Sequence, residues 1–267
     1  MTYFASLASG ERPTGQGFLP FLEGLAADME GVGESALASD PTRWANALPR
    51  AARLVGARAI LLGALDSVQQ ALAAELGGGT GSTGAVLADT LARLAETQRG
   101  TCDLAVLLPG PVTLLNGGDR ALLDALKTRL VALMEKLCAS RPALVLVDER
   151  DSSALAGTDA RRLFGTLKNV ADYYGVALGL RLSGADPLAA IAARRSLRID
   201  HLLLANPVAD AVACRAAAAE AGWRSVGVAA APSTVADAGP GDAALWVASA
   251  GQVRDIEALK AATGRAA

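Results

Sequence analysis

The sequence has 267 residues, three cysteines and a formal net charge of −2 at pH 7. A chain of this length buries a large core without disulfides or structural metals, so one domain over residues 1–267 is expected. The small net charge excludes a strongly basic surface for nucleic acid or for an anionic membrane. The wide spacing of Cys102, Cys138 and Cys214 excludes a disulfide framework and a paired zinc motif.

The N-terminus lacks the basic start and apolar run of a secretory signal. No apolar stretch reaches the roughly 18 residues that cross a bilayer. These features predict a cytoplasmic protein without a membrane segment.

Short apolar runs bounded by Gly, Pro, Asp or Asn alternate with longer helical segments along the whole chain. Most of the runs are apolar throughout, which is typical of parallel strands that are buried on both faces. In chain order, the predicted strands are 17–22, 59–63, 104–108, 143–147, 176–182, 201–205, 225–229 and 245–248. The predicted helices are 42–55, 85–98, 120–139, 159–174, 187–196, 208–221 and 253–262, with at most one helical turn in 232–242.

Helix starts are marked by capping residues. An aspartate or asparagine stands directly before a proline at 40–41, 186–187 and 206–207, and proline suits the first helical position. Ser249 and Gln252 have the spacing of a capping box for the last helix.

This alternation predicts an α/β fold with a parallel sheet and right-handed crossovers. Eight strands favour a single (β/α)8 TIM barrel with outer helices over an open doubly wound sheet. An open nucleotide-binding sheet would also need a phosphate-binding turn after its first strand, and the segment 17–24, GFLPFLEG, is not one. The glycine-rich segment 77–84 follows no strand and lacks the Lys-Ser/Thr ending of a P-loop, so we expect a flexible loop there.

In such a barrel the functional site lies at the C-terminal ends of the strands. The side chains that follow or end the predicted strands are therefore the candidates, and Glu23 is the first of them. The others are Asp66, the turn 109–113 with Thr113, Asp148, Glu149, Arg150, Arg181, Ser183, Asn206, Ser233, Thr234 and Ser249.

Three segments resemble the uroporphyrinogen decarboxylase superfamily, which includes corrinoid-linked methyltransferases and is related to cobalamin-independent methionine synthase. They are DPTRWANALPRAARLVGARAILLGALD at 40–66, LAVLLPGPVTLLNGG at 104–118 and VDER at 147–150. The resemblance runs from about residue 20 to residue 260, and it implies the same barrel.

The resemblance also shows what this chain has lost. Asp66 stands where the decarboxylases bind pyrrole nitrogens, but 17–24 has no arginine pair and Leu114 replaces a tyrosine. The methyltransferases hold zinc with a His-x-Cys after the fifth strand and a cysteine near the eighth. Arg181, Ser183 and Ser249 occupy those regions here, so we expect no metal and no cofactor.

Each candidate has a structural alternative. Asp66 would bind substrate or cap the helix after it, and Asn206 would contact substrate or, more simply, cap the helix at 207. Asp148 and Glu149 would supply a general base or a ligand for a substrate amine, or else an ion pair with Arg150 or Arg181.

Arg181 is a long cation in an apolar run, and it would bind a substrate carboxylate or pair with one of these acids. We expect catalytic roles for Asp66, Asp148, Glu149 and Arg181. Substrate-binding roles are expected for Thr113, Arg150, Ser183, Asn206 and Ser249.

Three functions are compatible with these residues. The first is a metal-free, lyase-like decarboxylase that acts on an anionic, carboxylate-bearing small molecule. The second is a methyltransferase without zinc that works with folate or with a corrinoid partner protein. The third is a degenerate barrel that binds a ligand or a partner after losing its chemistry. The sequence leaves open whether the chain forms a homodimer.

Overall fold

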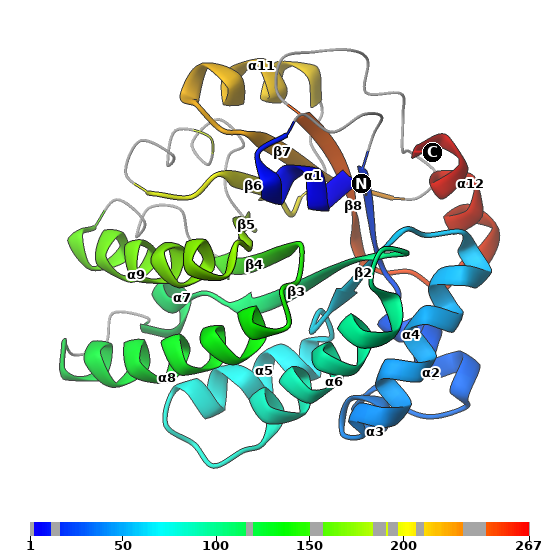
Figure 1. Ribbon diagram of the computed structural model, residues 1–267, viewed down its shortest axis with the longest axis horizontal. Helices are drawn as coiled ribbons and strands as arrows, with labels where there is room; N and C mark the ends of the chain where they lie inside the picture. The colour runs from blue at the N-terminus through cyan, green and yellow to red at the C-terminus, as the bar shows by residue number, and fades with distance from the viewer. Residues whose placement is uncertain are drawn as a thin grey trace.

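The computed structural model describes residues 3–11, 17–115, 120–149, 157–183, 191, 197–206, 211–231 and 244–266. Its centre is a parallel sheet, and helices lie outside it (Figure 1). The strands are β1 (Gly17–Phe21), β2 (Ala59–Leu62), β3 (Asp103–Pro109), β4 (Leu144–Glu149), β5 (Ala177–Leu182), β6 (His201–Leu204), β7 (Ser225–Ala230) and β8 (Ala244–Gln252).

The backbone ladder joins eight strands in the order β1-β8-β7-β6-β5-β4-β3-β2, and every pairing in it is parallel. The two end strands, β1 and β2, also lie in contact, so the sheet is curled. Between them, no backbone pairing is seen in the part of the chain that the structure describes. The predicted parallel α/β fold is therefore confirmed, as a curled, barrel-like sheet.

Each strand sends alternate side chains to opposite sides of the curled sheet, because the side-chain period of a strand is two. In β4, Leu144 and Leu146 belong to the cluster of buried side chains inside the curled sheet, called the inner cluster below. Val145 and Val147 pack against the helices on the other side. Both sets are buried, which explains why the strands read as unbroken apolar runs. This alternation also fixes the directions of the polar residues that end β4 and β5.

Apart from α1, the helices pack on the outer side of the sheet (Figure 1). Among them α4 begins where predicted, because the Asp40 side chain accepts hydrogen bonds from the N–H groups of Thr42 and Arg43, both at 3.0 Å. The helices are α1 (Tyr3–Ser9), α2 (Glu23–Glu30), α3 (Glu34–Ala38), α4 (Pro41–Val55), α5 (Asp66–Leu76), α6 (Thr83–Gln98), α7 (Pro111–Leu115), α8 (Arg120–Ala139), α9 (Thr158–Tyr174), α11 (Ala211–Ala221) and α12 (Ile256–Ala266).

One predicted helix start is wrong. Ser249 and Gln252 do not form a capping box, because both belong to β8, which continues four residues beyond its predicted end at 248. The last helix instead starts at Ile256, where Asp255 accepts a hydrogen bond from the N–H of Ala258 at 3.0 Å. The predictions for 186–196, 207–210 and 232–242 fall outside the described residues, apart from residue 191.

The short helix α1 closes the N-terminal end of the curled sheet. Phe4 and Leu7 are buried in the inner cluster with residues from several strands. The N–H of Phe4 donates to the carboxylate of Asp103, the first residue of β3, at 2.7 Å. The opposite end, where the strands finish, is therefore the end left for a site. In the described part of the chain no helix is long and apolar enough to cross a membrane.

We expect Phe4→Ala to lower the free energy of unfolding by about 3 kcal/mol, because a buried aromatic ring is removed from a closed interior. Chemical denaturation measures this loss. Tyr173→Ala is the matched control, since the Tyr173 side chain is 84% exposed and its removal should change stability by less than about 0.5 kcal/mol. Equal effects of the two substitutions would contradict the role given to α1.

Candidate functional site

Asp148 and Arg181 form an ion pair at the C-terminal ends of β4 and β5. They are partners in the strand register, and Arg181 Nη1 lies 2.6 Å from Asp148 Oδ1. Each lies an even number of positions after an inward-facing residue of its strand, and side chains alternate along a strand, so the pair faces the interior of the curled sheet. The side chains remain 14% and 16% exposed, and solvent therefore reaches them.

An aromatic ring lies beside this pair. The guanidinium carbon of Arg181 is 6.0 Å from the centre of the Phe21 ring, which ends β1 on the inner side. This distance is within the range of a cation–π contact. Strands β1, β4 and β5 thus bring a cation, a carboxylate and a ring together.

Glu149, the next residue along β4, faces the other way and is fully buried. Its carboxylate accepts hydrogen bonds from the N–H groups of Val112 and Thr113 at 2.8 and 2.7 Å, and from the Thr113 hydroxyl at 2.6 Å. Gly110 makes room for it, because a Cβ there would lie 2.2 Å from Glu149 Cδ. Glu149 therefore holds the turn that follows β3.

Glu23 does the same for the turn after β2. It is also fully buried, and its two carboxylate oxygens accept hydrogen bonds from the N–H groups of Gly63 and Ala64 at 2.8 and 2.7 Å. Gly63 has φ +86°, a backbone conformation that favours glycine. The sequence showed Glu23 directly after the first strand, but it gave no sign of which turn the carboxylate would bind.

Gln69 connects the turn after β2 to strand β3. Its amide nitrogen donates to the carbonyl oxygens of Gly63 and Leu107, at 2.5 and 3.0 Å. Glu23, Gln69 and Glu149 thus tie neighbouring chain segments together near the C-terminal ends of β1 to β4.

Burial raises the pKa of both glutamates to about 7 from an ordinary value of 4.5. The hydrogen-bond donors around each carboxylate act in the opposite direction, because they favour its charged form. Nearby carboxylates, Glu34 for Glu23 and Asp148 for Glu149, add a smaller increase. Both groups are therefore poised to exchange a proton near neutral pH.

In the described part of the chain, no side-chain contact joins the remaining predicted residues to the Asp148–Arg181 pair. Asp66 is exposed in the first turn of α5, and the cap residue there is Leu65, so the capping alternative is wrong. Ser183 is half-buried and its N–H donates to the Glu149 carbonyl at 3.1 Å. Asn206 is exposed, and Arg150 lies outside the described residues.

Ser249 is buried near the end of β8, and its hydroxyl has no hydrogen-bond partner within the described part of the chain. His201 is the first residue of β6, at the N-terminal end of that strand. There its Nδ1 lies 2.9 Å from the buried Ser225 hydroxyl. Among the described residues, no three His, Cys, Asp or Glu side chains are grouped closely enough to hold a metal ion.

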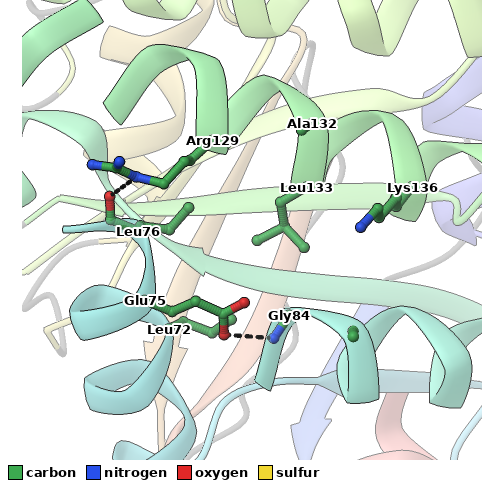
Figure 2. Close-up of a pocket in the computed structure, with 9 residues that line it drawn as sticks. Leu72, Glu75, Leu76, Gly84, Arg129, Ala132, Leu133 and Lys136 are labelled. Atoms are coloured by element: carbon green, nitrogen blue, oxygen red, sulfur yellow. Dashed lines mark hydrogen bonds between the residues drawn. The ribbon is translucent and has the colours of Figure 1, made fainter. Parts of the chain in front are cut away.

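A hollow of about 190 Å³ lies on the outer surface between α5, α6 and α8 (Figure 2). The glycine-rich loop joins two of these helices, and the carboxylate of Glu75 accepts a hydrogen bond from Gly84 N–H at 3.1 Å (Figure 2). A carboxylate thus already occupies the helix N-terminus that a phosphate would need. Arg129 Nε donates to the carbonyl of Leu76 at 2.7 Å, which ties α8 to the end of α5.

Comparison with known proteins shows a shared fold. No protein-family model matches the sequence, and no curated protein matches it either. A methyltransferase from Methanosarcina mazei has a TM-score of 0.72 and 13% identity, over 99% of this chain and 97% of that one. A candidate vitamin-B12-independent methionine synthase from Listeria monocytogenes has a TM-score of 0.54 and 12% identity, over 94% and 95%.

A candidate phosphonomutase from Burkholderia cenocepacia has a TM-score of 0.50 and 15% identity, over 92% of each chain. All three likenesses are in fold, at low identity. The chain therefore has the TIM-barrel-like fold of these structures, which cover nearly its whole length.

Proposed function

We propose that this protein is an enzyme that binds a small carboxylate-bearing molecule at the C-terminal end of its curled sheet, as a degenerate (β/α)8 barrel of the uroporphyrinogen decarboxylase superfamily. The observation that carries the proposal is that the guanidinium of Arg181 faces the interior of the sheet and is still accessible to solvent. A planar guanidinium binds a carboxylate through two parallel hydrogen bonds. In barrels of this kind, chemistry takes place at this end of the strands.

The reaction that these residues favour is a metal-free, lyase-like decarboxylation. Arg181 holds a carboxylate that the substrate keeps, and Asp148 stands beside the carbon from which carbon dioxide leaves. Loss of carbon dioxide leaves the bonding electron pair with the substrate, where a cationic group next to that carbon accepts it, and a proton from water then replaces the carbon dioxide. Asp148 stabilises positive charge in the substrate while this takes place.

A second candidate is methyl transfer with a folate or a corrinoid partner protein. It is favoured by the overlap with the methyltransferase, which extends over 99% of this chain. A third candidate is ligand binding without catalysis. It is favoured by Glu149 and Thr113, whose side chains bond to each other and so are not directed at a ligand.

Thermal-shift and calorimetric measurements with tetrapyrrole carboxylates, small aromatic acids, folates and corrinoids test the proposal. An acid that binds the native state raises the unfolding temperature by mass action. We expect Arg181→Gln to weaken its binding by about tenfold or more, since a charged hydrogen bond is lost. Arg224→Gln is the control, because Arg224 pairs with Asp200 beside the N-terminal ends of the strands. Equal affinity in the wild type and Arg181→Gln would refute the assignment.

A further inference from the structure

The Asp148–Arg181 pair restricts which acids the site accepts, and this inference rests on the proposed function. Arg181 is not a bare cation, because Asp148 Oδ1 lies 2.6 Å from its Nη1. A ligand that carries only a carboxylate would approach Arg181 and be repelled by Asp148 next to it. The net charge of the pair is zero, so a simple anion gains little from binding there.

Both partners keep hydrogen-bonding capacity that no described residue uses. A guanidinium has five N–H donors and the pair uses Nη1, while an ionised carboxylate has about four acceptor positions. A second carboxylate can therefore bind Arg181 without displacing Asp148, provided that the ligand also gives Asp148 a donor. The donor must lie close to the ligand's carboxylate, because the two side chains are in direct contact.

Glu149 does not supply such a donor or relieve the repulsion. It faces away from the pair, and its carboxylate is held by Val112 and Thr113. Phe21 adds an apolar ring against the guanidinium of Arg181. The described side chains therefore provide one cation, one acceptor and one ring, and the cation lies beside each of the other two.

We propose that the substrate is an acid with an N–H or O–H donor beside its carboxylate, so that the carboxylate binds Arg181 while the donor binds Asp148. Acids without this donor are excluded by Asp148, which acts as the specificity-determining residue. An apolar or aromatic body next to the two polar groups would pack against Phe21.

Four probes that share a phenyl ring and one attached carbon test this proposal. Phenylglycine and mandelate carry the carboxylate with an ammonium or a hydroxyl, phenylacetate carries the carboxylate alone, and benzylamine carries the ammonium alone. We expect phenylglycine and mandelate to bind the full-length protein about tenfold more tightly than phenylacetate or benzylamine. Nuclear magnetic resonance titration measures these weak affinities and detects binding at Arg181.

The Asp148→Asn variant gives a signature that loss of folding cannot produce. Without the negative charge, phenylacetate should bind more tightly than it does to the wild type, while phenylglycine should bind more weakly. Asp89→Asn is the matched control, because Asp89 also pairs with an arginine, Arg93, but on the exposed face of α6. That variant should keep the wild-type order of affinities.

Two results would overturn this inference in different ways. If phenylacetate and mandelate bind equally well and both lose affinity in Arg181→Gln, the site binds anions but Asp148 does not select among them. The proposed function would then stand without this refinement. If no probe binds in a manner that depends on Arg181, both the refinement and the proposed anion site are wrong.

Discussion

Replacement of Glu149 by alanine should lower the free energy of unfolding by about 3 kcal/mol at neutral pH, because each part-buried donor left without a partner costs about 1 kcal/mol. Three donors lose their acceptor together, namely the N–H groups of Val112 and Thr113 and the Thr113 hydroxyl. The turn after β3 would also lose the contact that fixes it against β4. Urea denaturation at constant pH measures the loss.

Two further variants make this result specific. Glu149→Gln keeps one oxygen acceptor and should cost about half as much, since only some of the three donors lose their partner. Glu135→Ala is the matched control, because Glu135 is exposed on α8 and its truncation should change stability by less than about 0.5 kcal/mol. A loss in Glu149→Ala no larger than in Glu135→Ala would show that the turn does not depend on this carboxylate.

The fold was predictable from the sequence because each buried strand is a short run of consecutive apolar residues. A run such as 104–108 is apolar on both faces, and only a sheet covered on both sides requires that. The same rule placed Asp148 and Arg181 at strand ends. Their pairing followed from β4 and β5 being neighbours, and it had been one of the alternatives for Arg181.

The role of Glu23 was not predictable, because it depends on contacts between distant parts of the chain. Its partners, Gly63 and Ala64, lie 40 and 41 residues away, across the join between the two end strands of the ladder. The substrate-binding role of Asp66 stays a prediction. β2 ends at Leu62, and Asp66 is exposed at the start of α5, where Leu65 is the cap residue.

β8 is longer than predicted, and this explains why the start of the last helix was predicted wrongly. The apolar run ends near 248, but β8 continues to Gln252 because its pairing with β1 shifts register between Leu19 and Phe21. Gln252 then accepts a hydrogen bond from the N–H of Gly24 at 2.9 Å. A tertiary contact thus overrides the local capping signal, and a single sequence does not contain that contact.

The stability of the protein should fall as the pH rises from about 4.5 to about 7. Burial raises the pKa of Glu23 and of Glu149 to about 7 in the folded state, above the ordinary value of 4.5. Between these pH values the folded chain binds more protons than the unfolded chain. The contribution of the two carboxyl groups to the free energy of unfolding is therefore complete below pH 4.5 and is lost as the pH rises through 7. At 1.36 kcal/mol per pKa unit, each carboxyl group contributes about 3 kcal/mol.

Other shifted groups act outside this range. The pKa of Asp200 is lowered from 3.8, against the effect of its burial, by its hydrogen bond and ion pair with Lys168. Its stabilising contribution is therefore present above 3.8 and is lost only as the pH falls further. The pKa of Lys168 is raised above 10.5 by Asp172 and Asp200, which outweigh its desolvation, so its contribution is lost only at high pH.

Denaturation curves of the wild type and of Glu23→Gln/Glu149→Gln, recorded at intervals from pH 4.5 to pH 8, isolate the two glutamates. The double variant has no carboxyl group at either position, so the decrease assigned to them should disappear from its pH profile. Each single variant should show about half of the decrease. Parallel pH profiles for the wild type and the double variant would mean that both glutamates keep ordinary pKa values, and that the donors of the two turns offset the effect of burial.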